Sequence, residues 1–133
     1  SDVYKRQELD TLLEESDIIS LHVPLNDATR GMIGAEEIQK MKKSAVLINT
    51  ARGPVTDANA LSEALKAGRI AGACVDVFEN EPPVAADHPL FSAPNTIVTP
   101  HIAFATREAM VKRAVTVFEN VKLYLKGTPQ NVM

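Results

Sequence analysis

The sequence predicts an α/β fold built on a mostly parallel sheet, and three features of the 133-residue chain support this prediction. Four apolar runs rich in β-branched residues have the length of strands. Helical patterns separate the first three runs, as parallel neighbours require. The runs are continuously apolar rather than alternating, which is typical of parallel strands buried on both faces. The four runs are 17–23, 44–49, 71–77 and 96–99.

Three segments are expected to be helical. Residues 35–41 carry acidic residues in the first turn and lysines at the end, a charge order that suits the helix dipole. Asp57 is a good N-cap for a second helix that ends near Gly68. A third helix begins near Thr106 and ends at Gly127, with an apolar stripe of period 3.6. The stripe consists of Met110, Ala114, Val117, Phe118, Val121 and Leu125.

The composition is that of an ordinary soluble globular domain, with 45% hydrophobic residues, a net charge of -3 and one Cys. A single Cys excludes a disulfide scaffold and fits a reducing compartment. The absence of a basic block argues against a nucleic-acid partner. No apolar stretch approaches the roughly 20 residues that a membrane span needs. We therefore expect a cytoplasmic protein with neither nucleic-acid nor membrane partners.

Polar residues follow three of the predicted strands at the point where each strand ends. Arg52 comes after the second strand, Asp76 and Glu81 stand at and beyond the end of the third, and His101 follows the fourth. Ligands of open α/β sheets bind outside the carboxyl ends of the strands. We therefore expect these side chains to share one edge of the sheet, where they could bind and protonate a small anion.

Each of these residue types suits a particular task. Arg52 can bind a carboxylate through two charge-assisted hydrogen bonds, or form a helix-terminal salt bridge. His101 can transfer a proton near neutral pH, or serve only as a structural hydrogen-bonding group. Glu81 can orient an imidazole, or be a solvated loop residue. Asp76 lies in an apolar run, so it needs a donor, either a backbone amide or a ligand carboxamide.

The remaining histidines and the cysteine are weaker candidates for functional residues. His22 and His88 are weaker candidates, because the first is expected to contribute through local backbone placement and the second stands in the proline-rich segment 78–95. That segment is expected to be a loop without a full helix. No metal-ligand spacing is present, so no metal site is expected. Cys74 stands in mid-strand and suits a small core residue.

Several motifs occur in an order that carries a family resemblance. They are LHVPL at 21–25 with the following Thr29, NTARGPV at 49–55, AGACVDVFENEP at 71–82 and TPHIA at 99–103. Together they resemble the D-isomer-specific 2-hydroxyacid dehydrogenase family over nearly everything from about Leu9 to Met133. One departure is Ala103, where many members carry Gly, and it bears on substrate preference.

The resemblance implies an NAD(P)-dependent dehydrogenase with a Rossmann-type doubly wound, mostly parallel sheet. Arg52 would bind the carboxylate of a small 2-oxo acid of the hydroxypyruvate, glyoxylate or pyruvate type. His101, oriented by Glu81, would protonate the 2-oxo oxygen as a hydride arrives, and Asp76 would receive the nicotinamide carboxamide. NAD or NADP would be the cofactor, and the full-length protein would be a homodimer. The other cofactor-binding residues would be Val23, Pro24, Thr29, Thr50 and Ala51, together with Arg52.

The glycine-rich fingerprint G-x-G-x-x-G is absent from the chain. The resemblance therefore implies that residues 8–133 are the C-terminal portion of an NAD(P)-binding domain, with the glycine-rich half and the substrate domain missing. Residues 1–7 do not resemble the family and are expected to be a non-native leader read from a sequencing-library transposon end, the alternative being a native polar turn. Without the missing half, which would cover an apolar edge and face, we expect the isolated chain to fold poorly or aggregate and to be inactive.

Two other functions stay open beside the enzyme. One is a non-catalytic, NAD-sensing protein of the corepressor type, and the other is an inactive gene remnant. The joint presence of Arg52, Glu81 and His101 favours the enzyme. The discriminating observation is loss of NADH absorbance that depends on a 2-oxo acid.

Overall fold

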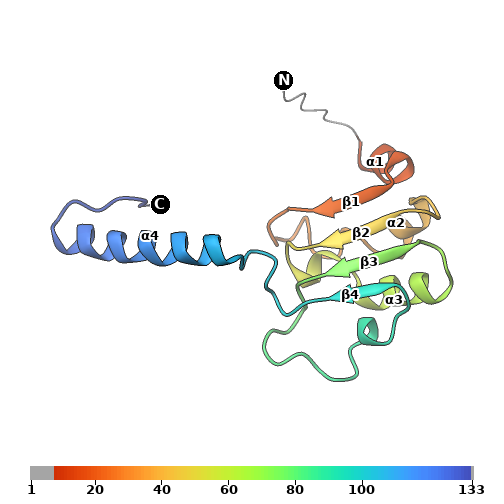
Figure 1. Ribbon diagram of the computed structural model, residues 1–133. Helices are drawn as coiled ribbons and strands as arrows, with labels where there is room; N and C mark the ends of the chain where they lie inside the picture. Colours follow the sequence, from red (N-terminus) through yellow and green to blue (C-terminus); the bar gives the residue numbers. More distant parts are fainter. Residues whose placement is uncertain (1–7, 133) are drawn as a thin grey trace. The chain divides into compact units, whose positions relative to one another are not determined.

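The first part of the chain is a parallel α/β unit. The computed structural model describes residues 8–132, and the chain divides into two compact units, Ser1–His101 and Ile102–Met133. The first unit holds a four-stranded parallel sheet in the order β1-β2-β3-β4 (Figure 1). The strands are β1 (Ile18–Leu21), β2 (Val46–Asn49), β3 (Gly72–Val75) and β4 (Thr96–Val98). The helices are α1 (Leu9–Glu15), α2 (Ala35–Lys40), α3 (Ala58–Lys66) and, in the second unit, α4 (Arg107–Leu125).

The predicted parallel α/β fold is confirmed, and one face of the sheet carries the core. Ile19 of β1 pairs in register with Leu47 of β2 and Ala73 of β3, and all three are buried. Leu13 of α1 and Leu61 of α3 belong to the same buried cluster. The three helices α1, α2 and α3 therefore cover the same side of the sheet.

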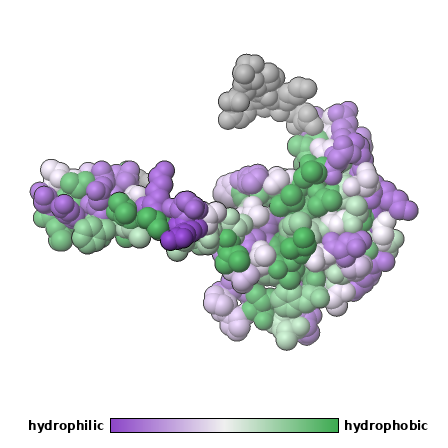
Figure 2. Space-filling view, viewed as in Figure 1, coloured by the Kyte–Doolittle hydropathy of each residue, from purple (hydrophilic) through white to green (hydrophobic). Residues whose placement is uncertain are grey.

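The opposite face of the sheet is open, so the strands are not buried on both faces, and the expected exposure of an apolar face is seen. Ser20, Ile48, Cys74 and Ile97 stand in one row across the four strands. Ile97 is 64% exposed, and Ile18 of β1 is 67% exposed. In Figure 2 hydrophobic surface lies over this unit. The apolar residues on this face are of the kind that a packing partner buries. The described part of the first unit places helices against the other face alone.

The two residues that the sequence predicted at the ends of α3, Asp57 and Gly68, are confirmed. The Asp57 carboxylate accepts hydrogen bonds from the backbone N–H groups of Asn59 and Ala60, at 2.9 and 3.0 Å, and so begins α3. Gly68 follows α3 with a φ of 61°, a backbone conformation that glycine adopts without strain. The sequence analysis did not predict α1, which has only seven residues and buries Leu13.

The second unit consists of α4 and its flanking residues. Thr106 is the N-cap, because its hydroxyl accepts a hydrogen bond from the N–H of Ala109 at 3.1 Å, and Gly127 follows the helix with a φ of 75°. Both ends agree with the prediction. Within its own unit α4 buries none of its residues, so the predicted apolar stripe stays exposed there. Among residues 8–132, no helix combines the length and apolar character that crossing a bilayer requires.

The connections of the first unit bring four strand ends to one edge. Each pair of neighbouring strands is parallel, so the residues that follow β1, β2, β3 and β4 all leave the sheet on the same side. The connection from β3 to β4 holds no full helix, as predicted, and contains a single 3₁₀ turn, η2 (Pro89–Phe91). A second 3₁₀ turn, η1 (Gly53–Val55), follows β2. This edge carries the candidate site.

Candidate active site

Backbone hydrogen bonds continue past the strand ends and place three segments side by side. The N–H of Asp76 donates to the carbonyl of Asn49 at 3.0 Å, which ties the end of β3 to the end of β2. The N–H of His101 donates to the carbonyl of Asp76 at 2.9 Å, which ties the residues after β4 to those after β3. Backbone hydrogen bonds therefore hold these segments at one edge of the sheet, as the sequence predicted.

Glu81 and His101 contact one another directly. The Nδ1 atom of His101 lies 2.6 Å from Oε2 of Glu81, although 20 residues separate them. The other carboxylate oxygen, Oε1, accepts the backbone N–H of Phe78 at 2.5 Å. In a neutral ring this arrangement puts the proton on Nδ1, because a carboxylate can only accept, and it makes Nε2 the nitrogen that can exchange a proton with a ligand.

His101 also has an uncommon backbone conformation. Its φ is 54°, in the left-handed region that few residues other than glycine adopt. The N–H of His101 donates to the carbonyls of both Asp76 and Thr99, at 2.9 and 3.1 Å. These bonds hold the strained residue in place, a situation found at functional sites. The side chain is 40% exposed, so a small molecule can reach it.

Asp76 is buried at the end of β3, with 3% of its surface exposed. Its Oδ1 atom accepts a hydrogen bond from the hydroxyl of Thr99. Sequence reasoning expected a backbone amide or a ligand carboxamide as the donor and missed this hydroxyl. Since Asp76 and Thr99 lie on neighbouring parallel segments, the pairing needs the strand register and cannot be seen in the linear sequence.

Arg52 projects from the turn that follows β2. Its Nη1 atom donates to the neighbouring carbonyl of Ala51 at 2.6 Å, and within residues 8–132 no carboxylate forms an ion pair with it. The helix-terminal salt bridge weighed above is thus not seen. Asn49, 1% exposed, holds this turn by donating to the Arg52 carbonyl at 3.0 Å and accepting from the Ala51 N–H at 3.1 Å.

The turn that carries Arg52 contacts the loop that carries Glu81 through Gly53. A Cβ atom at this position would lie 2.5 Å from the backbone nitrogen of Glu79 and closer still to the carbonyl of Phe78. Only glycine permits so close an approach of the two backbones. Gly53 thus joins the Arg52 turn to the Glu81 loop, and the resulting cluster is the candidate active site.

The remaining predicted cofactor residues lie along the same edge, farther from Glu81. Val23, Pro24 and Thr29 follow β1, which β2 separates from β3, so these residues do not adjoin the Glu81–His101 pair. The Thr29 hydroxyl donates to the Pro24 carbonyl at 2.6 Å and so closes its own loop. Thr50 and Ala51 follow β2, and Ala51 is buried.

The chemistry of this edge fits a dinucleotide cofactor bound beside a small acid. Backbone turns follow β1 and β2, a buried carboxylate closes β3, and an imidazole follows β4, all on the side where open α/β sheets bind ligands. Among the described residues, no group of three or more His, Cys, Asp and Glu side chains is placed to hold a metal ion. The arrangement places an arginine, a buried carboxylate and a histidine–glutamate pair along one edge of the sheet.

Comparison with known protein families gives a match over most of the chain. A family profile described as "D-isomer specific 2-hydroxyacid dehydrogenase, NAD binding domain" matches residues 1–103. The prediction about residues 1–7 concerns residues that the structure does not describe, so it stays a prediction.

Individual proteins extend this similarity. The glycerate dehydrogenase of Methylorubrum extorquens is 51% identical over 130 residues, which are 95% of this chain and 40% of that protein. The glyoxylate reductase of Thermofilum pendens is 54% identical over 120 residues, which are 90% of this chain and 35% of that protein. The chain thus spans well under half the length of these relatives.

Solved structures show the same fold. The D-lactate dehydrogenase of Lactobacillus jensenii, determined with NAD+, superposes with a TM-score of 0.85 at 35% identity. The superposition covers 96% of this chain and 42% of that one. Another solved neighbour was determined in complex with NADPH.

Proposed function

Because the chain belongs to the family of D-isomer specific 2-hydroxyacid dehydrogenases, we propose that the protein containing it transfers a hydride between NAD or NADP and a small 2-oxo or D-2-hydroxy acid. The observation that carries the proposal is the 2.6 Å contact between Glu81 and His101 on the edge that also holds Arg52. The names of the relatives, glycerate dehydrogenase and glyoxylate reductase, favour substrates of the glyoxylate and hydroxypyruvate type.

Arg52 binds the substrate in this proposal. A guanidinium offers a planar pair of N–H donors that matches a carboxylate, and Arg52 has no carboxylate partner among the described residues. Its remaining donors would hydrogen-bond the 2-oxo oxygen and polarise the carbonyl bond. Asn49 and Gly53 hold the turn, so the guanidinium starts from a fixed backbone.

His101 moves the proton. During reduction, Nε2 of the protonated ring gives a proton to the 2-oxo oxygen while the carbonyl carbon gains a hydride, so the C=O bond becomes a C–OH group. In the reverse direction the neutral ring takes the hydroxyl proton. The Glu81 carboxylate stays on Nδ1 throughout, orients the ring and stabilises its positive charge.

The nicotinamide, when bound, would supply or accept the hydride. Asp76 would accept from its carboxamide, since this buried carboxylate faces the same edge as His101 and already accepts one hydroxyl. The loop 23–29 and the turn residues Thr50 and Ala51 would contact the rest of the cofactor. The homodimer stays a prediction for the full-length protein.

The test uses a chimera, because the chain spans only part of its relatives. In the chimera, residues 8–133 replace the matching segment of the Methylorubrum glycerate dehydrogenase. Loss of NADH or NADPH absorbance is followed with glyoxylate, hydroxypyruvate and pyruvate. We expect turnover of at least one acid, and we expect His101→Ala to lower kcat by roughly 10²- to 10⁴-fold with little change in KM.

Two results would contradict the proposal. A chimera that binds NADH and turns over none of the three acids would support the non-catalytic, NAD-sensing alternative. An unchanged kcat in the His101→Ala variant would remove this residue from the mechanism.

A further inference from the structure

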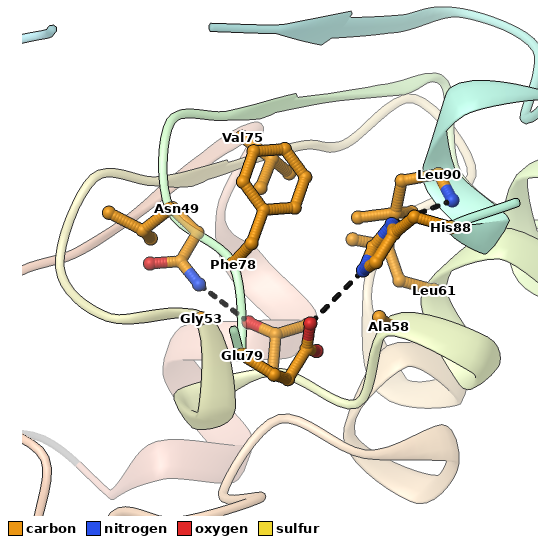
Figure 3. A pocket seen from close by; sticks show the side chains of 11 residues that line it. Asn49, Gly53, Ala58, Leu61, Val75, Phe78, Glu79, His88 and Leu90 are labelled. Atoms are coloured by element: carbon orange, nitrogen blue, oxygen red, sulfur yellow. Dashed lines mark hydrogen bonds and ion pairs between the residues drawn. The ribbon is translucent and has the colours of Figure 1, made fainter. Parts of the chain in front are cut away.

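A second pair of a carboxylate and an imidazole lies in the loop that carries Glu81. The Nε2 atom of His88 is 3.0 Å from Oε2 of Glu79 (Figure 3). The His88 side chain is 11% exposed and so is more buried than that of His101. This pair lies outside the set of residues that the sequence assigned to the site.

Hydrogen bonds engage both ring nitrogens of His88. The backbone N–H of Leu90 donates to Nδ1 at 3.4 Å, where His88 caps the turn η2. Because Nδ1 accepts, a neutral ring carries its proton on Nε2, which donates to Glu79. The ring is therefore fixed between the start of η2 on one side and the Glu79 carboxylate on the other.

The same ring packs against Phe78. The two ring centroids are 5.0 Å apart with an interplanar angle of 88°, an edge-to-face contact, and Phe91 lies within 5.6 Å of both. Phe78 is 8% exposed and belongs to the core. Its backbone N–H is the donor that holds Oε1 of Glu81. His88 thus contacts Phe78 and Glu79, the first two residues of the segment 78–81.

We propose that His88 is a positioning residue for the Glu81–His101 pair, acting through its contacts with Phe78 and Glu79. Holding these two residues fixes the backbone donor that binds one oxygen of Glu81, and so keeps the other oxygen on Nδ1 of His101. His88 itself does not touch the reacting atoms. This inference rests on the proposed function, since Glu81 and His101 matter only if that reaction takes place.

The alternative is that His88 serves only as the cap of η2, and two substitutions separate the roles. In His88→Asn the short amide oxygen can still cap the N–H of Leu90, while its side chain falls short of Glu79. In His88→Gln the longer amide can donate to Glu79 in place of Nε2 but offers no acceptor near Leu90. Glu79→Ala and Glu79→Gln form the matching pair on the other side, the first removing the acceptor and the second keeping it.

All four variants are made in the chimera, and kinetics are measured with the best of the three acids. Positioning predicts that His88→Asn and Glu79→Ala lower kcat by about 10- to 100-fold with KM for the acid within about twofold. His88→Gln, which restores the contact with Glu79 but not the ring contact with Phe78, is expected to recover part of that loss, and Glu79→Gln most of it. If His88 served only as a cap, His88→Gln would lower kcat more than His88→Asn does. Glu79→Ala would then leave kcat unchanged.

Nitrogen-15 NMR of labelled histidines provides a readout independent of turnover. At a pH where the ring is neutral, the His101 signals of the parent chimera are expected to show the tautomer protonated on Nδ1. His88→Asn and Glu79→Ala are expected to shift them toward the tautomer protonated on Nε2, and the two Gln variants are not. Glu79→Ala removes a partly exposed side chain, so it decides the question if His88→Asn does not fold.

The outcomes separate the two proposals. If His101→Ala lowers kcat while His88→Asn and Glu79→Ala leave kcat and the His101 signals unchanged, the positioning role is refuted and the proposed function stands. If His101→Ala leaves kcat unchanged, the proposed function itself is refuted, and this inference with it.

Discussion

Gly53→Ala is the sharpest test of how the two loops of the site are joined. A Cβ atom there would lie 2.5 Å from the backbone nitrogen of Glu79, whereas an ordinary contact begins at 3.4 Å. The carbonyl of Phe78 would lie closer still, so the Arg52 turn and the Glu81 loop must separate by more than about 0.9 Å, because backbone cannot rotate away as a side chain can. This displacement lies between Arg52 and the Glu81–His101 pair.

The expected losses follow from that displacement. A misplacement of about 1 Å can cost 10²-fold in rate, so kcat/KM of the Gly53→Ala chimera should fall by about two orders of magnitude. Overpacking of this kind costs about 1–3 kcal/mol of stability, which should also lower Tm. Steady-state kinetics with glyoxylate or hydroxypyruvate and a thermal unfolding scan of the same sample measure both.

Gly34→Ala is the matched control. Its Cβ would meet the end of the flexible Glu37 side chain at 3.3 Å rather than backbone, and that side chain can move aside, so kcat/KM should be unchanged and any loss should be confined to Tm. A Gly53→Ala chimera with kcat/KM within twofold of the parent would refute the argument that this glycine sets the spacing of the two loops.

Three further outcomes are expected. Arg52→Lys should raise KM for the 2-oxo acid more than it lowers kcat, because an ammonium cannot form the paired bonds of a guanidinium, and equal KM values in the two chimeras would contradict this. Asp57→Ala should lower the stability of the chimera by about 1 kcal/mol in denaturant titration with kcat unchanged, because α3 loses its N-cap, and an unaltered midpoint would argue against the cap. The isolated chain should aggregate or unfold without cooperativity and show no turnover, because the sheet exposes Ile18 and Ile97. A cooperative thermal unfolding transition together with reduction of a 2-oxo acid would overturn that expectation.

The sequence predicted the parts of the fold that local chemistry decides. The strands and the helix caps at Asp57 and Thr106 form through residues that are close together in the sequence. Each of them lies at its predicted position or within a few residues of it. The helix α1 was missed, because its seven residues lack both a side-chain cap and a long apolar stripe. An exposed apolar face was predicted, but not which face, because an apolar run does not say which of its two sides has a partner.

The candidate site divides in the same way. Residues at strand ends could be assigned to one edge, because parallel strands carry their ends to the same side. The bond of Asp76 to Thr99 and the backbone contact at Gly53 depend on register and on the path of a loop, and residue types carry no signal for either. His88 was a weak candidate in sequence, because its partner Glu79 lies nine residues away across an irregular loop.

The positive φ of His101 has a consequence for protein engineering at this position. Asn and Asp tolerate this region of backbone conformation better than alanine does, and a bulky or β-branched residue would be held there only at a cost of about 1–3 kcal/mol. An asparagine would therefore keep the main-chain path through Thr99 and Pro100 while deleting the imidazole. Comparing the asparagine and alanine replacements would divide any lost rate into a part due to missing proton transfer and a part due to a relaxed backbone.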